Sequence, residues 1–202
     1  MSISLKKGQK VSLTKDNPNL IKIIVALGWD TNEYDGGYQF DLDASLFLLN
    51  NKNKIRKYKD EHGMWQDDIV FYNRLIGGDK SVIHSGDNLT GAGEGDDEVI
   101  TVDFSKMPIN IEELDFIVTI HDAHNRRNQN FGQVNDAYVR VLDPDQNNIQ
   151  LLKFDLGEDF SVETAVSVCK IYRKDGEWKF SAEGVGYAHG LDGFVRDHGL
   201  MA

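Results

Sequence analysis

Cysteine is nearly absent from this chain, which has 202 residues and only one thiol, Cys169. A single cysteine excludes an internal disulfide and fits a reducing compartment. Because its neighbours Val168 and Ile171 are apolar, we expect Cys169 to be a buried structural thiol and not a nucleophile. Proline is also scarce, with three residues, and there is no Pro/Ser-rich linker and no tandem repeat. One domain, large enough to bury a core without disulfides, is the simplest interpretation.

Long apolar runs are missing as well. No window approaches the ~18 apolar residues that a membrane-spanning helix needs. The first 20 residues have neither the apolar segment nor the cleavage pattern of a signal peptide. We therefore expect a soluble cytoplasmic protein, and we leave peripheral attachment at the inner face of the membrane open.

Positive charge is the third deficit. The chain has 33 acidic and 22 basic residues, a formal net charge of -11. A nucleic-acid backbone would be repelled on average, so we expect no nucleic-acid partner. The only basic run comprises Lys52, Lys54, Arg56, Lys57 and Lys59.

The apolar residues that are present form short runs rich in β-branched and aromatic side chains. These runs predict strands at 20–29, 45–49, 69–72, 99–104, 114–121, 137–142, 149–154, 166–173 and 177–185. The Asp175-Gly176 pair predicts a tight hairpin between the last two strands. The turn formers at 143–148 predict a second hairpin.

Many strands at short spacing, with little helical periodicity, predict an all-β fold. We expect a β-sandwich of two mostly antiparallel sheets with short helical segments in loops, near 111–113 and 191–198. We assign residues 1–190 to this domain and expect residues 191–202 to be a poorly packed C-terminal tail.

The most unusual segment is 84–98. It holds five carboxylates and four glycines but no lysine or arginine, a composition that strands and helices avoid. Clustered negative charge repels itself unless a cation is bound. Carboxylate oxygens, together with glycines that let backbone carbonyls turn inward, suit a hard cation such as Ca²⁺. We interpret the segment as a calcium-binding loop.

A second acidic group, Asp41 and Asp43, lies at the entrance to the strand predicted at 45–49. In an extended chain the i, i+2 spacing puts both carboxylates on one face. If that strand end adjoins the 84–98 loop, the carboxylates converge, raise one another's pKa values and destabilise the fold until a divalent ion binds. The site is not an EF-hand, because the nearest lookalike, at 143–154, has Asn148 and Phe154 where that loop needs Gly and Glu.

Signals for catalysis are weak. The chain has no H-E-x-x-H and no G-x-S-x-G motif, and we assign structural or surface roles to His84, His121 and His124. We therefore expect no enzymatic activity. The weakest alternative is a metal-dependent hydrolase using an ion-bound water beside His84. The Gly91-x-Gly93-x-Gly95 pattern is no phosphate-binding loop, although a bound calcium ion could bridge it to an anionic ligand.

Several motifs together resemble one known family. The chief motif is Gly86-Asp87-Asn88-Leu89-Thr90-Gly91-x-Gly93-x-Gly95-Asp96-Asp97-Glu98. It is supported by Leu27-Gly28-Trp29-Asp30, Phe40-Asp41-Leu42-Asp43-Ala44-Ser45, Phe131-Gly132-Gln133-Val134 and Glu177-Trp178-Lys179-Phe180. Over nearly its whole length the chain resembles the TerD family of bacterial tellurium-resistance and general stress proteins.

This resemblance implies a β-sandwich that binds calcium, commonly two ions in neighbouring sites. The positions that match the family's ligands are Asp41, Asp43, Asp87, Asn88, Asp96, Asp97 and Glu98, with backbone carbonyls near Gly93 and Asp30 as a further ligand. It also implies a stress-response protein that binds protein partners of the tellurium-resistance system, some of them membrane-associated. A distant relative is described as a cAMP-binding protein, so the alternative is a calcium-dependent binder of a small anionic ligand such as a cyclic nucleotide. The role of residues 50–66 cannot be carried over.

Overall fold

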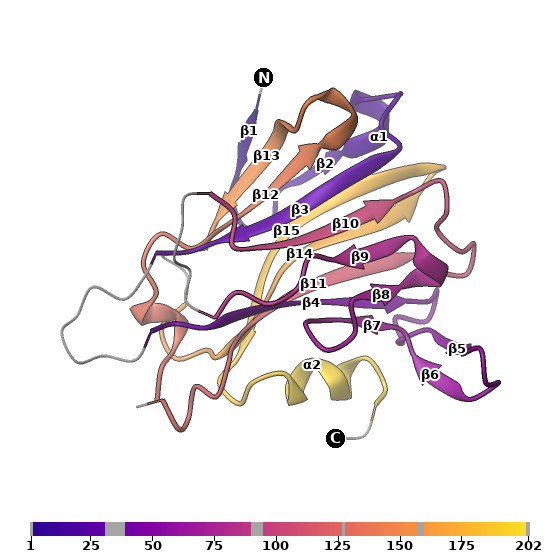
Figure 1. Cartoon of the computed structure of the whole chain (residues 1–202). Coiled ribbons are helices and arrows are strands. Elements are labelled where there is room, and N and C mark those ends of the chain that lie inside the picture. The colour runs from indigo at the N-terminus through magenta and orange to yellow at the C-terminus, as the bar shows by residue number, and fades with distance from the viewer. Residues whose placement is uncertain (1, 31–38, 90–94, 127, 157–159, 201–202) are drawn as a thin grey trace.

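The computed structural model describes residues 2–30, 39–89, 95–126, 128–156 and 160–200. Its strands form a seven-stranded sheet, a six-stranded sheet and a separate two-stranded hairpin (Figure 1). The described strands are β1 (Ile3–Leu5), β2 (Lys10–Ser12), β3 (Lys22–Gly28), β4 (Leu42–Leu49), β5 (Lys57–Lys59), β6 (Trp65–Asp67), β7 (Ile69–Val70), β8 (Ile76–Gly77), β9 (Val82–His84), β10 (Glu98–Asp103), β11 (Glu113–Ile120), β12 (Tyr138–Asp143), β13 (Ile149–Asp155), β14 (Ala165–Lys174) and β15 (Glu177–Tyr187).

The two large sheets pack as a sandwich, which confirms the predicted all-β class. The first has the order β1-β13-β12-β3-β10-β9-β8 and the second β2-β15-β14-β11-β4-β7. Strand β1 runs parallel to β13, and every other pairing among the described strands is antiparallel. Both predicted hairpins are present, as β12-β13 and β14-β15. Within the described ranges, no helix is long and apolar enough to cross a membrane.

Strand β4 shows how the layers form, because all eight of its residues are buried. Alternate side chains of a strand point to opposite faces. Leu46 and Leu48 therefore enter the core between the sheets, whereas Phe47 and Leu49 enter a smaller cluster on the other face of the second sheet. Cys169 is fully buried as expected, and burial raises the pKa of its thiol well above the ordinary value, with Asp115 adding to the effect.

The smaller cluster corrects one prediction. Residues 191–200 are not a poorly packed tail, since helix α2 (Asp192–Asp197) covers the outer face of the second sheet (Figure 1). Phe194 is only 3% exposed and joins the cluster of Phe47 and Ile117. The helical segment predicted near 191–198 is confirmed as α2. Its packing was not predicted, because a helix of six residues is too short to show a readable apolar period.

Two other short segments also differ from expectation. The predicted helical turn at 111–113 is wrong, because residues 111 and 112 form no helix and Glu113 opens β11. A helix that was not predicted, α1 (Leu13–Asp16), follows β2. It begins where the Ser12 hydroxyl accepts a hydrogen bond from the Lys15 N–H at 3.2 Å, a common N-cap arrangement.

A buried polar network fixes α2 to the sheet. The carboxylate of Asp115 in β11 accepts a hydrogen bond from the Ser167 hydroxyl of β14. Its other oxygen lies 3.2 Å from Nε2 of His198, the residue that ends α2. The second ring nitrogen of His198 contacts the Asn53 carbonyl at 3.2 Å, and the His198 carbonyl accepts the Ile55 N–H. Three chain segments thus meet at one imidazole.

Candidate metal centre

The acidic segments meet at a corner where β4 extends past its short neighbour β7. Along one edge of β4, the N–H and C=O groups of even-numbered residues point toward β7. The Leu48 N–H, for example, donates a hydrogen bond to the Asp68 carbonyl. Pairing with β7 begins only at Leu46, so Ala44 faces an open edge. Side chains from the first sheet complete that edge. Glu98 accepts the Ala44 N–H at 2.6 Å, and His84 Nε2 lies 3.1 Å from the Ala44 carbonyl.

His84 is a structural residue of this corner. Its Nδ1 accepts the Gly86 N–H at 3.0 Å, so Nε2 carries the proton that is donated to Ala44. The imidazole is 2% exposed, and both of its nitrogens bond to backbone groups. The hydrolase alternative was based on His84, and these bonds occupy both of its ring nitrogens. The absence of catalytic activity stays a prediction.

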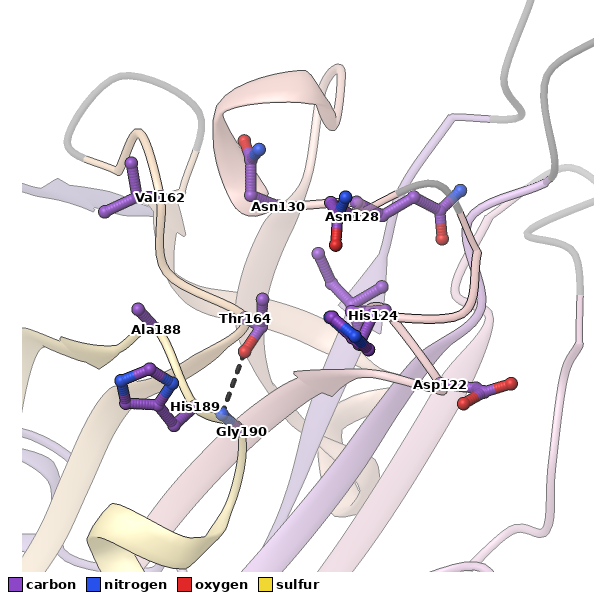
Figure 2. Close-up of a pocket in the computed structure, with 12 residues that line it drawn as sticks. Asp122, His124, Asn128, Asn130, Val162, Thr164, Ala188, His189 and Gly190 are labelled. Carbon is purple, nitrogen blue, oxygen red and sulfur yellow. Dashed lines mark hydrogen bonds between the residues drawn. The ribbon is translucent and has the colours of Figure 1, made fainter.

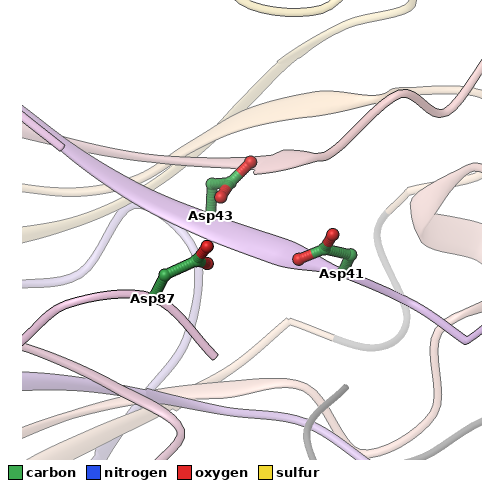
Figure 3. A group of neighbouring side chains, drawn as sticks. All are labelled: Asp41, Asp43 and Asp87. Atoms are coloured by element: carbon green, nitrogen blue, oxygen red, sulfur yellow. The ribbon is translucent and has the colours of Figure 1, made fainter. Parts of the chain in front are cut away.

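Three carboxylates converge beside this edge. Asp41 precedes β4, Asp43 lies within it, and Asp87 lies in the loop between β9 and β10. Each offers an oxygen within 4.8 Å of the oxygens of the other two, and in Figure 3 the three carboxyl groups face a common space. Asp41 and Asp43 are buried and Asp87 is exposed, so the space opens toward solvent on the side of Asp87.

Each of the two buried carboxylates contacts one basic side chain. Arg126 Nη2 lies 3.0 Å from Asp41 Oδ2, and His121 Nδ1 lies 3.2 Å from Asp43 Oδ2. Both belong to the turn that follows β11. Within the described part of the chain, the buried Oδ1 of Asp41 has no hydrogen-bond partner. A buried carboxylate oxygen without a donor is costly, and a cation in the shared space would satisfy it.

The electrostatics point the same way. Burial raises the pKa of Asp43 to about 7, with the charge of Glu98 adding to the rise and His121 opposing it. Burial also raises the pKa of Asp41, against the lowering effect of Arg126. Ionised carboxylates at this corner therefore destabilise the metal-free fold, and a divalent ion would reverse that penalty.

This arrangement predicts an inverted pH dependence for the metal-free protein. The unfolded Asp43 carboxyl titrates near its ordinary value of 3.8 and the folded one near 7, so between these values the folded state binds more protons. Stability then falls as pH rises through this window. In EDTA we expect a loss of at least about 1 kcal/mol between about pH 5 and about pH 8, since one pKa unit corresponds to ~1.4 kcal/mol. Urea unfolding of the wild type and of Asp43→Asn checks this.

The variant removes the titrating group, so its stability should change less over the same range. Equal slopes for the two proteins would show that Asp43 does not carry the effect.

Hydrogen bonds also hold the described residues on either side of 90–94 in this loop. Asp97 accepts the Trp29 N–H at 3.0 Å and the Asn88 side-chain amide at 2.9 Å. Burial raises the pKa of Asp97, and the charges of Asp96 and Asp30 add to the rise. Asn88 also donates its N–H to Glu98 at 3.4 Å. These bonds connect the loop to the ends of β3 and β10.

Other predicted ligands lie apart from the three-carboxylate group. Asp96 forms a two-pronged ion pair with Arg140 of β12, with N–O distances of 2.7 and 2.8 Å. Asp30 is exposed at the end of β3. Gly93 lies outside the described residues. Among the described residues the structure therefore joins Asp41, Asp43 and Asp87 and leaves Asp30, Asp96, Asp97 and Glu98 outside this group, although the charge of Glu98 adds to the raised pKa of Asp43.

A cavity of about 570 Å³ borders the turn that follows β11 (Figure 2). One wall holds Thr164, whose hydroxyl accepts the Gly190 N–H at 2.9 Å. Its lining is mostly polar and comes from three segments: Ile120, Asp122, Ala123, His124, Asn128, Gln129, Asn130, Val162, Thr164, Ala188, His189 and Gly190.

His121 and Arg126 are the site residues that the sequence did not reveal. Their sequence neighbourhood reads as an exposed polar turn. Their position beside the carboxylates follows from the strand register, because β11 pairs with β4 so that Thr119 lies opposite Asp43. Residues just after β11 must then lie beside the residues just before β4, and the His121 N–H does bond to the Asp41 carbonyl at 2.8 Å.

The fold and the site define a β-sandwich with a carboxylate cluster at one corner, and comparison with known proteins gives its family. The profile of the TerD domain matches residues 1–198. General stress protein 16U of Bacillus subtilis (strain 168) is 54% identical over 201 residues, covering 100% of this chain and 99% of that protein. Tellurium resistance protein TerD of Serratia marcescens is 45% identical over 202 residues, covering both chains completely. The chain belongs to the TerD family of tellurium-resistance and stress-response proteins.

A solved structure supports the architecture. The crystal structure of a homologue of telluride resistance protein (TerD) from Streptomyces coelicolor A3(2) superposes with a TM-score of 0.68. It covers 88% of this chain and 96% of the other at 21% sequence identity. At that identity the likeness establishes the fold alone, and the resemblance noted from the motifs is confirmed by the family match.

Proposed function

We propose that this protein is a calcium-binding module of the tellurium-resistance and stress-response type. The observation that carries the proposal is the convergence of Asp41, Asp43 and Asp87, with Asp41 Oδ1 buried and unpartnered among the described residues. The donors are all oxygens, which suits Ca²⁺ and gives no reason to expect a metal that prefers nitrogen or sulfur. An open side toward solvent leaves room for water ligands.

We extend the proposal to two ions. One would occupy the space between the three carboxylates. The other would lie near Asn88 and Asp97, since each carboxylate oxygen of Asp97 accepts one hydrogen bond and keeps a second lone pair. Asp30, whose charge adds to the raised pKa of Asp97, would contribute to that second site. Asp96 is already paired with Arg140, so a calcium ion would gain less from it than from an unpaired carboxylate.

The module would act by presenting a calcium-dependent surface to protein partners of the same system, in the cytoplasm. Three carboxylates at one corner carry a formal charge of about -3 when ionised, and one divalent ion reduces this to about -1. This change in charge would alter the affinity of a partner protein that binds at this corner. Capture from lysate of the native cell on wild-type protein, in calcium and in EDTA, identifies such partners.

The direct test is calorimetric titration of the EDTA-treated and dialysed chain with Ca²⁺ and, separately, with Mg²⁺. We expect saturable calcium binding with a stoichiometry near two and weaker magnesium binding, since Mg²⁺ demands a stricter octahedron and retains more water. A stoichiometry of one would remove the second site from the proposal. No calcium heat at any of several temperatures would refute the proposal itself.

A further inference from the structure

We propose that Arg126 is the counter-ion of Asp41 in the acidic corner. It neutralises Asp41 when no metal is bound, and it thereby lowers the affinity of the site for calcium. This inference rests on the proposed calcium function. It concerns a residue outside the carboxylate ligands, and it assigns that residue an electrostatic role and not a role as a ligand.

The position of Arg126 is fixed by its backbone. The turn after β11 is tied to the β4 end through the His121 N–H bond to the Asp41 carbonyl at 2.8 Å. Within the turn, the Arg126 N–H bonds to the Asp122 carbonyl at 3.0 Å. Asp122 adopts a left-handed backbone conformation with φ of 51°, a geometry that Asp tolerates better than most residues. The turn therefore delivers the guanidinium to Asp41 from a defined direction.

The contact is one-sided. Arg126 Nη2 approaches Asp41 Oδ2 at 3.0 Å, while Oδ1 of the same carboxylate is left without a donor in the described structure. The guanidinium side chain is 28% exposed and the carboxylate side chain 2% exposed. The buried charge of Asp41 is thus compensated by the guanidinium of Arg126, which reaches it from the partly exposed edge of the site. The guanidinium could therefore move away without repacking of the core.

The charge of Arg126 is permanent. An arginine stays protonated in proteins, whereas a histidine can lose its proton near neutral pH. Of the two basic residues that contact the cluster among the described residues, only Arg126 therefore supplies a full positive charge at every working pH. A divalent ion entering the shared space would be repelled by that charge and would also take over its role of neutralising Asp41.

A purely positional role for Arg126 predicts a different outcome. By holding Oδ2, the guanidinium could orient Oδ1 toward the ion, as outer residues often do for metal ligands. Loss of that contact would weaken calcium binding. Charge and position can be separated, because Gln keeps a donor and removes the charge, whereas Lys keeps the charge and changes the donor geometry.

The experiment compares calcium affinities of wild type, Arg126→Gln and Arg126→Lys by calorimetry. We expect Arg126→Gln to bind calcium about tenfold or more tightly, given the size of charge interactions at partly exposed sites, and Arg126→Lys to stay close to wild type. Arg196→Gln in α2 makes the same change in net charge away from the corner and should leave the affinity unaltered. Weaker binding by both Arg126 variants, or unchanged binding by Arg126→Gln, would overturn the inference.

A second measurement does not depend on calcium. In EDTA, Arg126→Gln, Asp41→Asn and the double variant form a thermodynamic cycle read by urea unfolding. We expect Arg126→Gln to destabilise the wild type clearly and to have little effect once Asp41 is already neutral. Additive effects would refute the counter-ion role even if calcium binds, whereas coupling without any calcium binding would refute only the proposed function.

Discussion

Replacing Asp43 by Asn is expected to shift the melting temperature in opposite directions without and with calcium, so that the variant melts above wild type in EDTA and below it in calcium. Without metal, the substitution removes a buried charge next to Glu98 and Asp41, both of which raise the pKa of Asp43. With metal, it removes a ligand oxygen from the three-carboxylate group. One change therefore acts in opposite directions in the two conditions.

The magnitude follows from linkage. An ion at about 100 times its dissociation constant stabilises the folded state by about 2.7 kcal/mol. For a chain of this size each kcal/mol shifts the melting temperature by about 2–4 °C, so wild type should gain about 5–10 °C from calcium. The variant should keep only a small part of that gain.

Thermal melts in EDTA and in excess calcium measure the two shifts directly. Asp145→Asn serves as the matched control, because Asp145 lies exposed in the β12-β13 turn, far from the corner in sequence and sheet order. It makes the same change of charge and should follow wild type in both conditions. If Asp43→Asn gains as many degrees from calcium as wild type does, Asp43 is not a ligand.

The sequence predicted the longer strands well because each apolar run carries its own signal, whereas the short strands β1, β2, β5, β6, β8 and β9 were not predicted. The run at 20–29, for example, became β3 (Lys22–Gly28), whose last four residues are all buried. The pairing of Asp41 with Asp43 on one face was also readable, since it needs only the period of a strand. That Asp87 joins them follows from the order of strands in the sheets, which local patterns do not encode.

The hydrogen-bond and ion-pair partners of individual carboxylates could not be predicted from the sequence, for the same reason. Asp96 and Asp97 are neighbours in the chain with nearly identical sequence surroundings, yet Asp96 pairs with Arg140 and Asp97 binds backbone and amide donors. The difference arises because Arg140 lies in β12, two strands from β10 across β3. Composition therefore located the acidic site, and tertiary structure decided which of its carboxylates face one another.

Replacing Asp115 by Ala should cause the largest loss of stability outside the metal site, about 3–5 kcal/mol, the usual cost of breaking a buried charged pair from one side. Asp115 is 1% exposed. It accepts from Ser167, faces His198 Nε2 at 3.2 Å and lies 3.6 Å from Lys170 Nζ. Its removal leaves buried donors without an acceptor.

The loss should appear first at the C-terminal helix. Because His198 joins Asp115 to the Asn53 carbonyl, the variant loses the polar anchor of α2 while Phe194 keeps its apolar contacts. Urea unfolding in EDTA gives the total loss, and limited proteolysis should cut the 188–200 segment faster than in wild type. Asp155→Ala is the control, because its ion pair with Lys153 is exposed and should contribute less than about 1 kcal/mol.

A cycle with His198→Ala then separates anchoring from general damage. If the network acts as one unit, His198→Ala costs much less in the Asp115→Ala background than in wild type, because the two residues share one interaction. Strictly additive losses would mean that Asp115 stabilises the sheet alone and that α2 is held by Phe194 and its neighbours. In that case proteolysis of the segment would be as slow in Asp115→Ala as in wild type.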